Sequence, residues 1–284
     1  MSQIVLGRDL SPAETLLFMR IDQLLVSRGL ASTRSQAQRL IASGVRWRNE
    51  GAWKRVAKNG DEVSTDAEIE LLDNAEARFV SRGGLKLEGA LKHVGLELSE
   101  LVCLDLGQST GGFTDCLLQR GASRVVGIDV GYGQLHEQLR ADTRVTCLER
   151  VNARSVTMAE ISAAMAGPNL SDDVVDIADL EEVAVEFDVI VGDLAFISQT
   201  LVLPAVAPMV KPGGAVLMLV KPQFELQPGQ VGKGGIVTDA ALYDFVQQRV
   251  TTAHQDLGLT VKAYFESSIQ GGDGNREFFI YSVR

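Results

Sequence analysis

The sequence predicts an α/β protein in which a doubly wound, mostly parallel sheet follows a small N-terminal α+β module. Apolar runs of six or seven residues recur from residue 101 onward, and each is followed by a helical or loop stretch. Alternating strands and helices form a parallel sheet with helices on both faces. Residues 19–77 instead show two helix patterns followed by short β segments. The chain is long enough for one large domain and one small one.

The N-terminal module is expected to start after a tail at residues 1–18. Residues 20–30 place apolar side chains on one helical face, with Gly29 where a helix-terminating glycine belongs. A second helix is predicted over 34–43, with Ser32 or Thr33 as its N-cap and Gly44 at its end. Short β segments are expected at 45–48, at Val63 and at 69–72. An acidic stretch, 61–76, forms the edge of the module and a linker.

Basic residues are concentrated in this module, although the whole chain carries a net charge of −10. Residues 19–58 contain nine basic and two acidic residues, which gives +7 and leaves −17 for the remainder. A compact basic module on an acidic chain is typical of a head that binds RNA or DNA. A solvated helix face is the alternative, and the interleaved apolar residues disfavour it.

The larger domain is assigned to residues 78–284. A helix is predicted to start at Gly83-Gly84, and strands follow at 101–106, 124–130, 144–149, 187–192 and 215–220. A final hairpin is expected from 259–266 and 277–283, because IQGGDGN separates them, and it adds one antiparallel strand. The window 172–188 holds eight acids and no base, and we interpret it as a solvated insertion.

Two of these strands end in a charged residue. FDVIVG (187–192) leads into Asp193, and AVLMLV (215–220) leads into Lys221. In an open parallel sheet the ligand crevice lies outside the carboxyl ends of the strands. An acid and an amine are therefore expected in one crevice, which indicates an enzyme.

The turn after the first strand is a glycine-rich loop, DLGQSTGGFTD (105–115), which allows the backbone to approach a ligand closely. Neither the dinucleotide fingerprint nor the phosphate-binding loop with its lysine is present. Asp105 would repel a pyrophosphate and suits a cationic ligand such as S-adenosylmethionine, which has an ammonium and a sulfonium. Asp129 ends the second strand, where an acid accepts hydrogen bonds from ribose hydroxyls. A helix cap or a surface acid is the alternative for Asp129.

The chain resembles the TlyA family, whose members join an S4-type RNA-binding domain to an FtsJ-like methyltransferase domain. The resemblance covers about residues 19–284 and rests on motifs that occur in order: RID (20–22), LASTRSQA (30–37), FVSRGGLKLE (79–88), STGGFTDCLLQRGA (109–122), GIDVGYGQL (127–135), VKPQFE (220–225) and VGKGG (231–235). Two positions depart from the family pattern. Gln108 stands where a small residue is usual, and Ala195 stands where a serine is usual.

This likeness implies 2′-O-methylation of ribosomal RNA, usually at cytidine, with S-adenosylmethionine as the cofactor. It also implies a catalytic set matched by motif to Lys86, Asp193, Lys221 and Glu277. The reaction needs the 2′-hydroxyl proton to be removed, and a lysine can act as the base. Lys221 is placed for this, because Pro222 favours an extended backbone before it, while Lys86 would supply a neighbouring charge. Glu277 is expected at the same edge if the hairpin's first strand is parallel to the others.

The remaining site predictions are the residues that would bind the cofactor and the RNA. The cofactor set comprises Asp105, Gly107, Ser109, Gly111, Gly112, Phe113, Asp129, Asn152 and Asp193. The RNA set, which would hold phosphates without reading sequence, comprises Arg20, Arg34, Arg39, Arg46, Lys58, Arg82 and Lys233. The loop around Lys233 is alternatively a lid. No metal site is expected.

Three rival functions stay open at this point: a non-catalytic S4-type factor in ribosome assembly, a dehydrogenase on the same fold, and a membrane-active toxin. No apolar run approaches the roughly 20 residues that span a bilayer, and the N-terminus lacks signal-peptide features. Three scattered cysteines fit reduced thiols. We therefore expect a cytoplasmic protein whose partner is ribosomal RNA or a ribosomal subunit, without a membrane partner.

Overall fold

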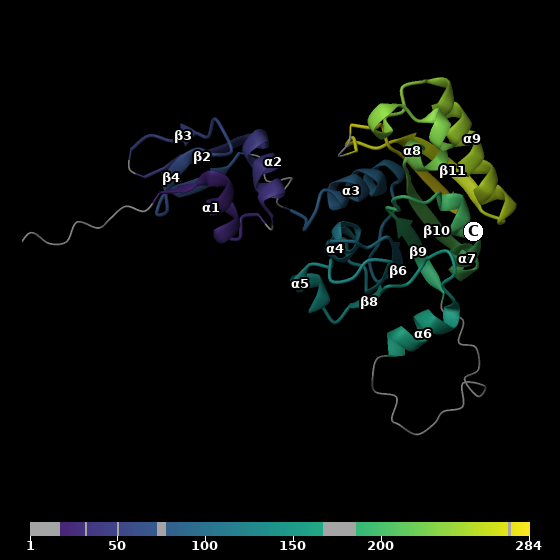
Figure 1. Cartoon of the computed structure of the whole chain (residues 1–284). Coiled ribbons are helices and arrows are strands. Elements are labelled where there is room, and N and C mark those ends of the chain that lie inside the picture. The colour runs from purple at the N-terminus through teal and green to yellow at the C-terminus, as the bar shows by residue number, and fades with distance from the viewer. Residues whose placement is uncertain (1–17, 32, 50, 73–77, 167–185, 272–273) are drawn as a thin grey trace, which may run out of the picture. The chain divides into compact units, whose positions relative to one another are not determined.

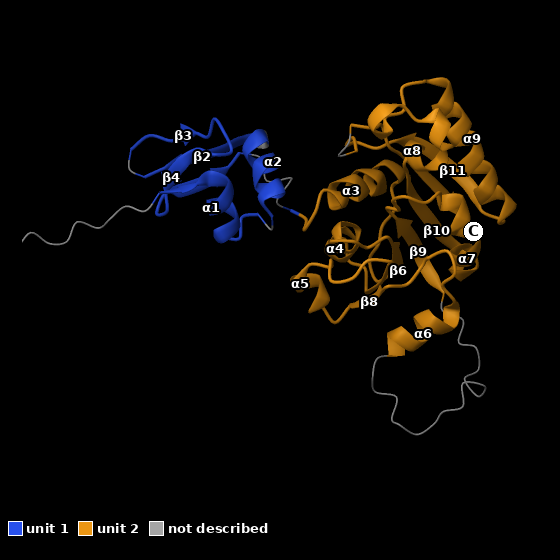
Figure 2. Cartoon of the chain, viewed as in Figure 1, with its two compact units in different colours: residues 1–78 blue, residues 79–284 orange. Residues whose placement is uncertain are grey.

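The computed structural model describes residues 18–31, 33–49, 51–72, 78–166, 186–271 and 274–284. Contacts divide the chain into two compact units, residues 1–78 and 79–284 (Figure 2). The predicted tail, apart from Phe18, and most of the acidic insertion at 172–188 lie outside the described residues.

The N-terminal unit packs two helices against two small sheets (Figure 1). The helices are α1 (Ile21–Ser27) and α2 (Arg34–Gly44), and the sheets pair β1 (Phe18–Arg20) with β4 (Glu62–Ser64), and β2 (Val45–Arg48) with β3 (Lys54–Arg55) and β5 (Glu68–Leu71). Gly29, at φ +70°, closes α1 with the hydrogen bonds Gly29 N–H to Val26 O and Leu30 N–H to Leu25 O, which form a Schellman motif. The Thr33 hydroxyl accepts from Gln36 N–H and caps α2, as predicted.

In the described part of the larger unit, seven strands form one sheet in the order β11-β12-β10-β9-β6-β7-β8. β12 is antiparallel to both of its neighbours, and the other strands run parallel to one another. The strands are β6 (Val102–Leu106), β7 (Arg124–Asp129), β8 (Val145–Glu149), β9 (Phe187–Gly192), β10 (Val210–Val220), β11 (Thr260–Glu266) and β12 (Phe278–Val283). The α/β fold class with its antiparallel terminal strand is therefore confirmed.

Helices cover both faces of this sheet (Figure 1). Alternate residues of each strand face opposite sides: Leu104 and Leu106 pack with helices α6 (Met158–Ala166), α7 (Leu203–Val206) and α9 (Ala241–Asp256). Cys103 packs on the other face with α3 (Gly83–Val94) and α4 (Gly112–Gln119). The short helices are α5 (Glu137–Arg140), α8 (Pro222–Glu225), η2 (Gln199–Leu201), η3 (Ala207–Met209), η4 (Pro228–Gln230) and η5 (Lys233–Gly235).

The strand order fixes where a ligand can bind. From β6 the chain moves outward through β7 and β8, and then returns to β9 on the other side of β6. The connections therefore diverge at the carboxyl ends of β6 and β9, and ligands bind at such a switch point. The glycine-rich loop follows β6, and Asp193 follows β9.

Candidate active site

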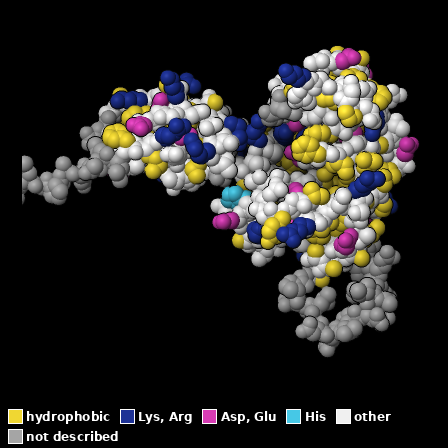
Figure 3. All heavy atoms as spheres, in the orientation of Figure 1, with side chains coloured by type: hydrophobic (Ala, Val, Ile, Leu, Met, Phe, Trp, Pro, Cys, Tyr) yellow, Lys and Arg dark blue, Asp and Glu magenta, His cyan; other side chains and the backbone are white. Residues whose placement is uncertain are grey.

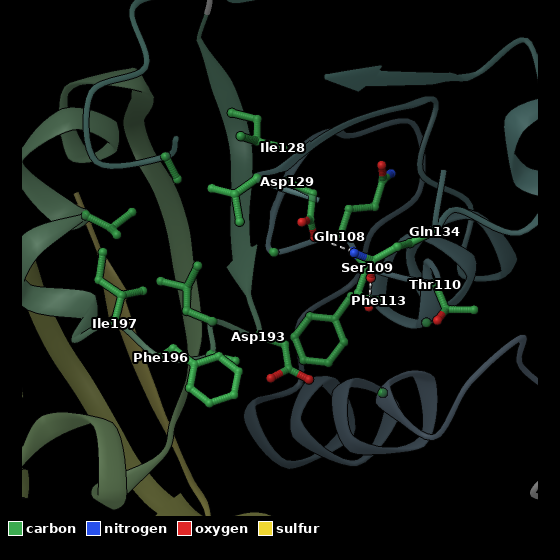
Figure 4. Close-up of a pocket in the computed structure, with 18 of the residues that line it drawn as sticks. Gln108, Ser109, Thr110, Phe113, Ile128, Asp129, Gln134, Asp193, Phe196 and Ile197 are labelled. Atoms are coloured by element: carbon green, nitrogen blue, oxygen red, sulfur yellow. Dashed lines mark hydrogen bonds between the residues drawn. The ribbon is translucent and has the colours of Figure 1, made fainter. Parts of the chain in front are cut away.

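A cavity of about 630 Å³ opens at the switch point (Figure 4). Its size is that of a typical small-molecule site. The loops after β6, β7, β8, β9 and β10 contribute to its wall, with Gly107, Gln108, Ser109, Gly112, Phe113, Ile128, Asp129, Val130, Gln134, Asn152, Asp193, Phe196 and Lys221 among the residues that line it.

The glycine-rich loop is folded so that only glycine fits at critical points. Gly107 has φ +78°, and a Cβ there would lie 2.8 Å from the Asp193 carbonyl oxygen. Gly111 has φ +97°. Asp129 ties the loop to β7, because its Oδ2 accepts from Ser109 N–H at 2.7 Å while Oδ1 accepts from Gly131 N–H at 2.6 Å. Figure 4 shows Asp129 facing Ser109 across this hydrogen bond.

Asp105 lies behind this loop and is fully buried. Its Oδ2 accepts from the Thr114 hydroxyl at 2.7 Å, and Thr114 in turn accepts from the Gln108 amide at 2.9 Å. Burial raises the pKa of the Asp105 carboxyl to about 7, and the charges of Asp193 and Asp129 act in the same direction. Gln108, one of the departures from the family pattern, fills the space that Gly127 leaves open on β7.

Asp193 and Lys221 form an ion pair on the cavity wall, with 2.5 Å between Lys221 Nζ and Asp193 Oδ1. Their side chains are 23% and 14% exposed. Lys221 has φ −107° and ψ 102°, the extended backbone that Pro222 favours. Strands β9 and β10 are parallel neighbours, so both side chains leave the sheet at the same edge.

Lys86 and Glu277 form a second ion pair, at 2.5 Å, with side chains only 9% and 4% exposed. Lys86 comes from α3, and Glu277 immediately precedes β12. The register of β10 and β12 pairs Val220 with Phe278, which sets Lys221 opposite Glu277 just beyond the ladder. The four charged residues matched by motif are therefore brought to one sheet edge as two ion pairs.

The predicted cofactor residues divide into two groups. Gly107, Ser109, Gly112, Phe113, Asp129, Asn152 and Asp193 line the cavity, whereas Asp105 and Gly111 do not. Of the four residues in the catalytic set, Asp193 and Lys221 line the cavity, while Lys86 and Glu277 are not part of its wall.

Sequence reasoning assigned no role to Phe196, which stands out in the structure. Phe196 is 91% exposed, lines the cavity and has φ +63°, a backbone conformation that is strained for a bulky residue. Its ring lies 5.1 Å from that of Phe224, and Lys221 Nζ lies 6.0 Å from the centre of the Phe224 ring. Phe196 follows Asp193 by three residues in a stretch without periodicity. Only its position shortly after a strand end could have indicated a role in the site.

The predicted RNA-binding residues lie in different environments. Arg20 and Arg34 both pair with the buried Asp22, at 3.0 and 2.9 Å, and Arg46 pairs with Glu70 at 2.7 Å. Arg39 is half-buried in α2, and Lys58 is exposed. In the larger unit, Arg82 donates to the Gln270 carbonyl at 2.6 Å, and Lys233 is exposed on η5. Figure 3 shows Lys and Arg side chains gathered over the N-terminal unit.

No helix within the described ranges is long and apolar enough to cross a membrane.

Comparison with known proteins assigns both units. The family model for FtsJ-like methyltransferases matches residues 79–284, and the S4 domain model matches residues 19–44. A curated relative, the 16S/23S rRNA (cytidine-2′-O)-methyltransferase TlyA of Mycobacterium tuberculosis, is 39% identical over 92% of this chain and 88% of its own. YqxC of Bacillus subtilis, described as a candidate rRNA methyltransferase, is 40% identical over 92% of this chain and 84% of its own.

A solved structure of a candidate hemolysin from Streptococcus thermophilus is also similar. It is 36% identical, covers 95% of this chain and 90% of its own, and superposes with a TM-score of 0.67. The motifs, the two matched domain models and these relatives agree, and the chain therefore belongs to the TlyA family, in which an S4 domain precedes an FtsJ-like methyltransferase domain.

Proposed function

We propose that this protein transfers a methyl group from S-adenosylmethionine to a ribose 2′-hydroxyl of cytidine in ribosomal RNA. The observation that carries the proposal is the Asp193–Lys221 ion pair, which lies in the wall of the switch-point cavity beside the glycine-rich loop. The TlyA relatives support the substrate class, because the M. tuberculosis protein is named for methylation at cytidine 2′-oxygen in rRNA.

The cavity residues fit the cofactor. The carboxylates of Asp129 and Asp193 stand on the wall, and Lys221 offsets the charge of Asp193. The remaining charge of Asp129 favours a cationic ligand and disfavours a pyrophosphate. Both Asp129 oxygens already accept a backbone N–H, but a carboxylate has lone pairs left for ribose hydroxyls. The cofactor supplies a methyl group on a positively charged sulfur, from which an oxygen nucleophile can displace it.

The chain's own residues then have to hold the 2′-hydroxyl in line with that methyl and remove its proton. Lys221 suits this role because it lies on the wall, whereas Lys86 is buried against Glu277 away from it. Asp193 orients Lys221 through their ion pair.

Phe196 suits the nucleobase that accompanies this ribose. An almost fully exposed aromatic ring at the rim of the cavity offers a surface on which a base can stack, and such stacking contributes about 1–3 kcal/mol per base. A base that stacks there has left its helix, which brings its ribose within reach of Lys221. The basic residues of the S4 domain would hold the phosphates of the same RNA.

The proposal is tested by incubating the purified protein with labelled S-adenosylmethionine and rRNA from a strain that lacks this modification. We expect label at a cytidine 2′-oxygen, located by mapping the modified nucleotide. RNA binding without any transfer of label would favour the rival function, a non-catalytic S4-type factor in ribosome assembly. A melting temperature that rises with a nicotinamide dinucleotide rather than with S-adenosylmethionine would favour a dehydrogenase.

A further inference from the structure

Two loops carry the partners of the Asp193–Lys221 ion pair, and both are short. Residues 193–198 follow β9, and the turn of α8 follows Lys221. Residues 194–197 make no backbone–backbone hydrogen bond to any residue that the structure describes. The first loop is fixed at its start by Asp193 N–H donating to Leu106 O at 3.0 Å, so its other end needs a separate anchor.

That anchor is Glu225, the last residue of α8. The residue is 3% exposed. Glu225 Oε1 accepts from Gln199 N–H at 2.9 Å, and Oε2 accepts from the Ser198 hydroxyl. Ser198 and Gln199 lie at the far end of the loop that starts with Asp193.

The two loops are thus connected at three points along their length. The Asp193–Lys221 ion pair joins their first residues, the Phe196 and Phe224 rings meet at 5.1 Å, and Glu225 binds Ser198 and Gln199 at the far end. The Glu225 contact is buried, whereas Phe196 is exposed. The Glu225 contact is the most buried of the three, so solvent screens it least, and a carboxylate that accepts from two donors makes strong hydrogen bonds.

Glu225 has a long ion pair with Arg249, whose Nε lies 4.0 Å from Oε2. Its shorter contacts are those with Ser198 and Gln199, which are neutral. Behind Gln199 stands His254, whose Nε2 lies 3.4 Å from Gln199 Oε1 and whose Nδ1 lies 2.8 Å from the Ser282 hydroxyl. Burial lowers the pKa of His254 to about 4 and raises that of Glu225. Burial of a carboxylate whose closest donors are neutral is costly for folding, so we expect Glu225 to contribute to the arrangement of the loops more than to stability.

We propose that Glu225 is a positioning residue, which sets the spacing between the Asp193 loop and the Lys221 turn and thereby the place of Lys221 in the active site. The inference rests on the proposed methyl transfer. Glu225 does not line the cavity, so it acts through Asp193 and Lys221 rather than on the substrate. Loss of the anchor frees residues 194–198 and lets the ion pair shift, and a displacement of about 1 Å at a reacting group can cost roughly a hundredfold in rate.

The test compares Glu225→Ala, Glu225→Gln and the control Glu160→Ala in the full-length protein. Glu160 is a control matched in its donors, because its carboxylate also accepts from a backbone N–H and a hydroxyl, both of Thr157, but it is exposed and lies at the start of α6. Calorimetry with S-adenosylmethionine gives the number of competent sites, and single-turnover methylation of rRNA gives the rate for each competent site. A role confined to stability would lower the number of sites and leave the rate per site unchanged.

We expect Glu225→Ala to lower the rate per competent site on the order of a hundredfold, with RNA affinity unchanged. Glu225→Gln should retain most of the wild-type rate per site, because its amide oxygen still accepts from Gln199 N–H. Should Glu225→Ala not fold, Ser198→Ala replaces it and is expected to lower the rate per site several-fold. A per-site rate within twofold of wild type in the alanine variant that folds would overturn the inference. Absence of methylation by wild type and the Glu160 control would refute the proposed function instead.

Discussion

The ion pairs across the β2–β5 sheet of the N-terminal unit and the two ion pairs at the candidate active site differ in how far they are removed from water. In the N-terminal unit the pairs Arg46–Glu70 and Arg48–Glu68 have side chains between 38% and 64% exposed. In the larger unit Lys86–Glu277 is at most 9% exposed, and Lys221–Asp193 at most 23%. Exposed pairs contribute about 0–1 kcal/mol and exchange partners easily. Buried pairs often cost as much in desolvation as they gain.

This difference separates two uses of charge. A surface that must release its own carboxylates and take up phosphates needs weak pairs. A site that must hold an amine beside a reacting oxygen needs pairs that solvent does not disturb. On the proposed function, the exposed pairs of the N-terminal unit suit a binding surface, and the two buried pairs of the larger unit suit a catalytic site.

The largest effect is expected from Lys221→Ala. It removes the only lysine on the cavity wall formed by the described residues. Loss of a general base typically costs 10²–10⁴ in rate, so single-turnover methylation should fall by at least about a hundredfold. RNA affinity, measured by filter binding, should stay within about twofold. Retained activity would remove Lys221 from the proposed mechanism.

The Lys86–Glu277 pair tests whether burial serves function rather than stability. Lys86→Met leaves the Glu277 carboxylate buried without its cation, and we expect it to cost about 3–5 kcal/mol in the free energy of unfolding. Lys86→Met with Glu277→Leu should restore wild-type stability or exceed it, yet remain inactive. Urea unfolding followed by circular dichroism measures the stability of both variants, and the labelling assay measures their methylation activity. A double variant that is both stable and active would contradict a catalytic role.

Much of this arrangement could be predicted because apolar runs specify buried strands, and the residues after them must meet at one sheet edge. β9 was predicted at its observed bounds, and β6, β7 and β8 within one residue. β10 begins earlier than predicted, at Val210, because Lys211-Pro-Gly-Gly looks like a turn and forms instead an irregular start of the strand. β1 was missed, because three residues carry no detectable alternation.

The unpredicted parts of the site lie in loops. The left-handed backbone of Phe196 and the Glu225 contacts to Ser198 and Gln199 depend on how two loops fold against each other. Neither hydrophobic periodicity nor local turn chemistry encodes such contacts. The pairing of Lys86 with Glu277 likewise joins residues far apart in sequence, and only the family motif placed them together.

Asp22 is a buried carboxylate in the N-terminal unit, whereas the other ion pairs compared in this unit are exposed. It tests whether a buried pair in this unit serves stability. Hydrogen bonds from Arg20 and Arg34 hold the pKa of Asp22 well below its usual range. A depressed pKa contributes stability above the ordinary value, near 3.9, that is lost as pH falls toward the folded-state pKa. Asp22→Asn should therefore lower the melting temperature of this unit by roughly 5 °C at pH 7 and reduce the unit's loss of stability in acid, of which the lowered pKa of Asp61 causes another part. Both tryptophans of the chain, Trp47 and Trp53, lie in this unit, so their fluorescence follows its unfolding.

The smallest effects are expected from single cations of the N-terminal unit. Lys58 is exposed, whereas Arg46 is held by Glu70 and stacks on Trp53 at 5.0 Å. Replacing a phosphate contact weakens RNA binding evenly across sequences and lowers the salt slope by about one. Lys58→Ala should therefore weaken binding roughly threefold at low salt, and Arg46→Ala should do less, because its guanidinium must first leave Glu70. Lys262→Ala, at an exposed position of β11, is the control. A larger effect of Arg46→Ala than of Lys58→Ala would mean that the exposed ion pairs of this unit break when RNA binds. Each arginine would then exchange its carboxylate for an RNA phosphate.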